Sequence, residues 1–231
     1  MKPFIFAIFI SFTSAVIAVK ADSVYLNGVA GGGNYTIRVT SFAERRFKTI
    51  YKQKYDFSCG SATLASLLTF HYDHPVDEQA VFVDMYQNGD KQKIQREGFS
   101  LLDMKLYLAR QGYIANGYKI DLDNLLKINA PAITIINNNG YLHFVIIKGV
   151  SAYEVLVGDP AVGLKRMSRK DFEAMRENRI LFLINDKALN ADNHFQDANE
   201  WALQPKAPIE SVVNREHLSA FNLLQPGRWD F

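Results

Sequence analysis

Residues 53–62, with the sequence Gln-Lys-Tyr-Asp-Phe-Ser-Cys-Gly-Ser-Ala, lead directly into a stretch of apolar residues at helical spacing. The spacing predicts a helix over residues 60–72, beginning just after Cys59. A helix N-terminus presents unpaired backbone N–H groups and the positive end of the macrodipole, and both favour a thiolate. Cys59 is therefore a candidate nucleophile. The alternative is a buried structural cysteine, which is a common fate of a lone thiol.

Beyond this helix the patterning changes from helical to extended. Helices are predicted at 77–86, 101–111, 122–127 and 169–177, and strands at 132–136, 142–150, 153–157 and 180–184. Hairpin-type connections separate the strand-forming runs, so the strands should pair antiparallel. Helices followed by a meander predict the α+β class, with N-terminal helices packed on an antiparallel sheet.

Composition places the chain among globular proteins. Of its 231 residues, 48% are hydrophobic and 22% are charged, which excludes the disordered, collagen-like and disulfide-scaffold classes. The formal net charge is +2, so we expect no nucleic-acid partner. Cys59 is the single cysteine, which excludes an intramolecular disulfide and a cysteine-based zinc cluster, and the five histidines contain no pair four residues apart. We therefore expect neither a metal nor a cofactor.

The first 21 residues have the organisation of a secretory signal peptide. A short positive start precedes an almost wholly apolar run over residues 3–19, and small residues follow. This run is shorter than the roughly 20 residues needed to span a bilayer, which favours cleavage over the alternative of a membrane anchor. We expect a periplasmic mature chain without a stable membrane span. It should comprise a flexible lead-in with a possible edge strand (22–46), one compact domain (47–186) and a C-terminal arm (187–231).

Two further residues complete a candidate site. His143 follows an Asn-Gly turn at the start of one predicted strand, and Asp159 ends the next predicted strand. If these strands pair through a tight turn, the start of one lies beside the end of the other. The Asp159 carboxylate would then fix the tautomer of the His143 imidazole, as a general base requires. Taken singly, His143 is equally well explained as a core or surface histidine, and Asp159 as part of an ordinary Asp-Pro turn.

Four positions together resemble the cysteine peptidases of family thirty-nine. Gln53 stands six residues before Cys59, and a His-Phe-Val run at His143 and an Asp-Pro pair at Asp159 follow. The resemblance covers roughly residues 51–186. It implies the papain-like fold of enzymes best known for trimming double-glycine leaders from bacteriocin precursors. It also implies that the cysteine is the nucleophile, the histidine the general base, the aspartate the group that orients the histidine, and the glutamine an oxyanion donor.

Longer stretches resemble a narrower group in this family, the exported peptidase-like components of functional-amyloid export systems. Residues 55–62, 98–105 and 156–161 carry this resemblance. It implies an exported cysteine peptidase that processes or clears secreted amyloid subunits, with a polypeptide substrate and with the subunits or the export machinery as partners. Two alternatives stay open. One is a catalytically vestigial papain-fold binding module that assists protein export, and the other is a cysteine amidase of peptidoglycan.

Overall fold

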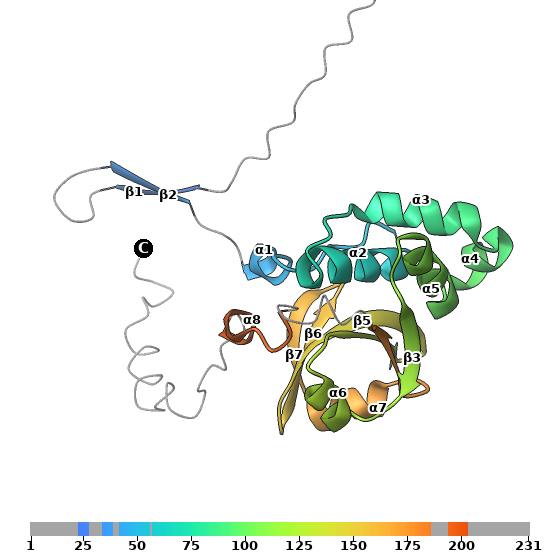
Figure 1. Cartoon of the computed structure of the whole chain (residues 1–231). Helices are drawn as coiled ribbons and strands as arrows, with labels where there is room; N and C mark the ends of the chain where they lie inside the picture. Colours follow the sequence, from blue (N-terminus) through green and yellow to red (C-terminus); the bar gives the residue numbers. More distant parts are fainter. Residues whose placement is uncertain (1–22, 28–33, 39–41, 56, 186–193, 203–231) are drawn as a thin grey trace, which may run out of the picture. The chain divides into compact units, whose positions relative to one another are not determined.

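The structure is a computed structural model of the chain (Figure 1). It describes residues 23–27, 34–38, 42–55, 57–185 and 194–202. The chain divides into two compact units, residues 1–42 and residues 43–231. The signal peptide predicted at residues 1–21 lies outside the described residues.

The first unit contains a small antiparallel sheet of two strands. These strands are β1 (Ser23–Asn27) and β2 (Asn34–Arg38). The edge strand predicted within residues 22–46 corresponds to β2. Its partner β1 was not predicted, and residues 28–33 of the predicted flexible lead-in lie outside the described residues.

The second unit holds the helices and strands that build the candidate site. Its elements are α1 (Phe42–Arg46, at the border of the two units), α2 (Cys59–His71), α3 (Glu78–Asn88), α4 (Lys91–Glu97), α5 (Leu101–Arg110), β3 (Ala115–Lys119), α6 (Leu122–Ile128), β4 (Ala132–Asn138), β5 (Tyr141–Val150), β6 (Glu154–Asp159), β7 (Gly163–Ser168), α7 (Arg169–Met175), β8 (Ile180–Ile184) and α8 (Ala198–Ala202). Among the described residues, no helix combines the length and apolarity needed to cross a bilayer.

A six-stranded antiparallel sheet lies between two groups of helices. The strand order is β3-β8-β4-β5-β6-β7. Figure 1 shows α2 to α5 on one side of the curved sheet and α6 and α7 on the other. Phe144 and Ile146 belong to the buried cluster of the first side, whereas Val145 and Ile147 belong to the cluster of the second. This alternation buries both faces of β5, and the arrangement confirms the predicted α+β class.

Local signals in the sequence specify several of these elements. The Ser100 hydroxyl accepts from the backbone N–H of Asp103, and the Asp103 carboxylate accepts from the backbone N–H of Ser100, which forms a capping box at the start of α5. Asn139 and Gly140 join β4 to β5 with φ values of 52° and 92°. Two successive left-handed residues form the hairpin turn that an Asn-Gly pair favours. This turn places the start of β5 at the surface.

The sequence patterning does not indicate α4, β3 or β7. Ile94 is the only buried residue of α4, so this helix lacks a continuous apolar stripe. β3 and β7 are the two edges of the sheet, and both carry mainly polar or half-exposed residues. Edge strands with charged side chains are common in natural sheets, because such residues discourage pairing with other chains.

Candidate active site

Cys59 is the first residue of α2, and a hydrogen-bonded loop holds it there. The Ser58 hydroxyl donates to Glu78 Oε1 over 2.8 Å and accepts from the backbone N–H of Tyr55 over 3.1 Å. Ser58 and Glu78 are both buried, so water competes little for these bonds. The helix starts one residue earlier than predicted, and it still places the thiol at its N-terminus.

His143 and Asp159 lie in contact, as the predicted hairpin of β5 and β6 requires. His143 is the third residue of β5, and Asp159 is the last residue of β6. His143 Nε2 and Asp159 Oδ1 are 2.7 Å apart, and the two residues are only 5% and 3% exposed. A short hydrogen bond between buried groups fixes the orientation of the imidazole ring.

A β-bulge interrupts the pairing of β5 with β6. Ile147 pairs with Val157, and Gly149 pairs with Leu156. Lys148 is therefore an extra residue on β5, with no partner on β6. Toward the start of β5 and the end of β6, the bulge shifts every pair of residues by one position.

This shift puts Asp159 on the same face of the sheet as His143. Ile146 pairs with Gly158, and continuing the pairing by one residue brings Asp159 opposite Val145. Opposed residues share a face, and Val145 shares its face with His143 because side chains alternate along a strand. Without the extra residue, Asp159 would lie opposite Ile146 and on the other face. The contact between imidazole and carboxylate thus depends on the bulge.

The electrostatics of this pair favour the ionised forms. Burial lowers the pKa of His143, but hydrogen bonds with Asp159 and Cys59 outweigh burial and raise this pKa to about 9. Burial raises the pKa of Asp159, but hydrogen bonds with His143 and Lys165 outweigh burial and hold this pKa well below its usual range. At neutral pH the site therefore favours an imidazolium beside a carboxylate.

Asp159 leaves one ring nitrogen of His143 open, and Cys59 lies close to the imidazole. Nε2 is bonded to Asp159, and Nδ1 is buried without a hydrogen-bond partner among the described residues. The thiol is nevertheless close enough to raise the pKa of the imidazole, and both residues line the same cleft. The contact is thus looser than an ideal hydrogen bond, which is common in active sites without substrate.

The stability of the fold should depend on pH through this pair. The folded state favours the imidazolium, so the stabilisation is complete below about pH 6.5 and is lost as the pH rises toward 9. A shift of this size corresponds to about 3 kcal/mol.

Asp159→Asn should bring the pKa of His143 back toward 6.5, because it removes the carboxylate partner. NMR titration of the imidazole in the parent protein and in Asp159→Asn measures this change in pKa. Equal titration midpoints in the two proteins would contradict the prediction.

Lys165 on β7 is a partner of Asp159 that the sequence patterning did not reveal. Its Nζ donates to Asp159 Oδ2 over 2.8 Å, while the backbone N–H of Ala161 donates to Oδ1 over 2.9 Å. Both carboxylate oxygens are thus engaged, which prevents rotation of the group away from His143. Because β7 was not predicted, the sequence offered no reason to place this lysine near the site.

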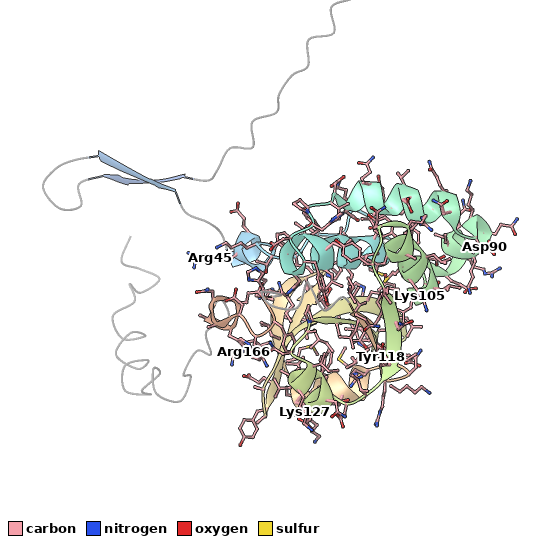
Figure 2. The ribbon with its side chains drawn as sticks, in the orientation of Figure 1. Arg45, Asp90, Lys105, Tyr118, Lys127 and Arg166 are labelled. Atoms are coloured by element: carbon pink, nitrogen blue, oxygen red, sulfur yellow. The ribbon has the colours of Figure 1, made fainter. Side chains whose placement is uncertain are left out.

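Lys165→Met should let Asp159 take up a proton at a higher pH, because one of the donors that stabilise its anion is lost. Lys165 is 28% exposed, so the cost in folding free energy should stay below about 1 kcal/mol. Carbon-13 NMR titration of the Asp159 carboxyl measures the shift. Lys127→Met, on the exposed surface of α6 (Figure 2), is the matched control and should change nothing. An unshifted carboxyl in Lys165→Met would show that the lysine has no such influence.

Gln53 lies beside the turn that follows Asp159. Its backbone N–H donates to Pro160 O over 3.0 Å, and its side-chain Nε2 donates to Tyr55 O over 3.3 Å. Gln53 Oε1 is buried without a hydrogen-bond partner among the described residues. The structure therefore places Gln53 close to the pair formed by His143 and Asp159, but its side chain does not line the cleft. An oxyanion contact requires its amide to turn toward Cys59.

An open cleft of about 780 Å³ gives access to Cys59 and His143. Its walls come from α4, the start of α5 and the start of β5. Phe57, Leu102 and Tyr141 line it and are 42%, 62% and 50% exposed. Apolar side chains left in contact with water around a reactive group are typical of a ligand-binding surface. Among the described residues, no three His, Cys, Asp or Glu side chains gather as a metal site would require.

Comparison with known proteins places this site in a family. The model of the Peptidase C39 family matches residues 47–188, which is more than half of the chain. The chain belongs to the Peptidase C39 family. This C39 chain is 39% identical over 177 residues to the "Probable functional amyloid protease FapD" of Pseudomonas fluorescens, covering 77% of this chain and 78% of that protein. Its identity to the protein of the same name from Pseudomonas aeruginosa is 38% over 174 residues, covering 75% and 76%.

A solved structure shows the same fold. The C39 chain resembles the peptidase domain of Streptococcus ComA, a bi-functional ABC transporter involved in a quorum sensing pathway, with a TM-score of 0.50 at 20% identity. The match covers 59% of this chain and 96% of that domain. At this level of identity the likeness shows the fold, and it confirms the predicted papain-like peptidase fold.

Proposed function

We propose that this chain is an exported cysteine peptidase that hydrolyses peptide bonds of secreted amyloid subunits. The observation that carries the proposal is the interaction of His143 with both Asp159 and Cys59 in the wall of an open cleft. Membership of the C39 family supports the peptidase class. The FapD relatives, whose names describe functional amyloid proteases, support the class of substrate.

In this proposal, Cys59 is the nucleophile and His143 serves as base and then as acid. His143 already holds the thiol proton at Nδ1 before attack, and the thiolate sulfur forms a bond to the carbonyl carbon of the peptide while the C=O π electrons move to the oxygen. The imidazolium then donates this proton to the leaving amine as the C–N bond breaks. A water molecule that is deprotonated by His143 hydrolyses the thioester and restores the thiol. Asp159 orients the imidazole and stabilises its positive charge throughout.

The tetrahedral intermediate carries an oxyanion that needs hydrogen-bond donors. The backbone N–H of Cys59 supplies one donor, because the first N–H groups of a helix have no acceptor within the helix. The side-chain amide of Gln53 supplies the second once it turns from Tyr55 O toward the cleft. Neither donor is charged, so the stabilisation of the oxyanion depends on how well the two N–H groups point at it.

The open cleft is large enough to admit side chains of an extended polypeptide. Its volume of about 780 Å³ lies within the range of ligand sites, and it carries apolar side chains exposed to solvent. Unfolded amyloid subunits present extended, apolar segments of this kind. A signal peptide over residues 1–21 would deliver the enzyme to the periplasm, where the subunits and their export machinery are the partners we propose.

Incubation of the mature chain with unfolded secreted amyloid subunits tests this function. Mass spectrometry should detect discrete peptide fragments that are absent when Cys59→Ala replaces the parent chain. Binding of the subunits without any fragments would overturn the proposal and would fit a binding module instead. Hydrolysis of muropeptides without hydrolysis of polypeptides would overturn it in favour of a peptidoglycan amidase.

A further inference from the structure

We propose that residues 194–202 are a positioning element of the active site. This segment, which we call the dock segment, packs on the β5 bulge and holds the strand register that brings Asp159 to His143. The dock segment lies beyond residues 47–188, which match the family. The inference rests on the proposed function only for its effect on turnover, because its effect on strand register can be measured without a substrate.

The dock segment supplies hydrogen-bond donors to two backbone carbonyl groups at the bulge. The backbone N–H of Gln196 donates to Lys148 O over 2.9 Å, and its side-chain Nε2 donates to Val150 O over 2.5 Å. A bulge disrupts the local ladder of hydrogen bonds, and buried carbonyl groups then need hydrogen-bond donors from elsewhere. Gln196 therefore stabilises the bulged form of β5 over a regular strand.

A buried ion pair ties the bulge residue itself to α8. Lys148 is fully buried, and its Nζ donates to Glu200 Oε1 over 2.5 Å. The same Nζ donates to the carbonyl and hydroxyl oxygens of Thr49 over 2.9 Å each. A buried ammonium group is tolerated only when it is paired and hydrogen-bonded. Slipping Lys148 out of the bulge would break all of these bonds at once.

Packing around the bulge leaves little room for another arrangement. A Cβ atom on Gly149 would lie 2.8 Å from both Gln196 Oε1 and Trp201 Nε1. Phe195 is buried in the same cluster as Val150, and Arg166 of β7 lies 5.3 Å from the ring of Trp201 (Figure 2). The dock segment thus contacts both β5 and the edge strand β7.

These contacts bear on His143 through Asp159. The charged and titratable groups that face His143 are Cys59 of α2 and Asp159 of β6, while Lys165 of β7 faces Asp159. The ring of Tyr141 stacks on the imidazole. Loss of the bulge would move Asp159 to the other face of the sheet and leave the remaining groups in place. The titration of His143 therefore reports the register directly.

Two variants of the full chain perturb the dock segment in different ways. Glu200→Gln removes the charge that pairs with Lys148 at nearly constant shape, whereas Gly149→Ala displaces the dock segment without changing any charge. Both should lower the NMR titration midpoint of His143 from about 9 toward its value in Asp159→Asn. Both should also lower kcat by about 10- to 100-fold with little change in KM, because a misplaced base acts on bound substrate.

Matched controls separate this role from a general loss of stability. Gly117→Ala places a Cβ 3.0 Å from the side chain of Ile180 in another part of the sheet, and Glu173→Gln breaks an ion pair with Arg176. Both should keep the parent midpoint of His143. If Gly149→Ala does not fold, Gln196→Ala takes its place with the same expected downward shift.

The outcomes distinguish this inference from the proposed function. A midpoint near 9 in every folded dock variant would overturn the inference and leave the peptidase proposal intact, as would equal shifts in the controls. A midpoint near 6.5 in the parent chain would instead contradict the pairing of His143 with Asp159, on which the proposed function depends.

Discussion

Replacement of Cys59 by alanine is expected to abolish hydrolysis of amyloid subunits, lowering the rate by about a million-fold. The thiolate is the only group in the proposed reaction that forms a covalent bond with the substrate, so no neighbouring side chain can take its place. Affinity for the subunit should be retained, because alanine leaves the apolar walls of the cleft unchanged. Initial rates of fragment formation and fluorescence anisotropy of a labelled subunit measure the two quantities.

Ser61→Ala is the matched control for Cys59→Ala. Ser61 is buried in the first turn of α2, and its hydroxyl donates to Ser58 O over 2.9 Å. This variant disturbs the start of the helix but keeps the thiol, so the rate should fall only severalfold, in line with the loss of one hydrogen bond. Fragment formation by Cys59→Ala at a rate near that of the parent chain would rule out the thiol as nucleophile.

Replacement of Gln53 by alanine should lower kcat by about 100- to 1000-fold while KM changes little. The amide is proposed to bind the oxyanion, which exists only in the transition state and the intermediate, so its loss spares substrate binding. Steady-state kinetics on a peptide that spans the identified cleavage site measures both constants. The backbone bond from Gln53 to Pro160 does not depend on the side chain and should persist.

Two further variants define what the Gln53 result means. Gln53→Glu keeps the size of the side chain but replaces the donor by an anion, so it should be at least as inactive as Gln53→Ala. Gln95→Ala changes a glutamine that lines the cleft and donates to Tyr86 OH, and it should have a small effect. A kcat within about threefold of the parent chain in Gln53→Ala would exclude the oxyanion role, since a usual donor contributes far more.

The sequence allowed the approach of the two strand ends that carry His143 and Asp159 to be predicted, because local signals determine it. Helical spacing after Cys59 indicated where α2 begins, and the Asn-Gly turn indicated where β5 begins. Antiparallel pairing of β5 and β6 then brought His143 and Asp159 together. Each step depends on residues that are close together in the sequence, and the folded chain keeps the local structure that these residues favour.

The bulge at Lys148 was beyond prediction for a physical reason. Simple alternation along β5 and β6 brings the two strand ends together but does not decide which face Asp159 occupies. That face depends on a single extra residue, whose position is set by contacts with Thr49 and Glu200, far away in sequence. Long-range contacts of this kind leave no periodic signal.

The residues that hold Cys59 and Asp159 in place could not be predicted from the sequence either. Glu78 holds the loop before Cys59, and Lys165 holds Asp159, yet both look like ordinary charged surface residues in the sequence. Glu78 lies in the first turn of a predicted helix, where an acidic residue is common for reasons of the macrodipole alone. Lys165 lies on the edge strand β7, which was not predicted. Only the folded chain brings these charges to the site.

The rate at which iodoacetamide alkylates Cys59 at pH 6 tests the central claim most directly. At this pH a free thiol is almost entirely protonated and reacts slowly. His143, with a pKa of about 9, is protonated and can stabilise a thiolate. We expect Cys59 to react faster than a free-thiol standard, and we expect His143→Ala to remove this advantage. Equal, slow alkylation of the parent chain, of His143→Ala and of the standard would contradict this claim.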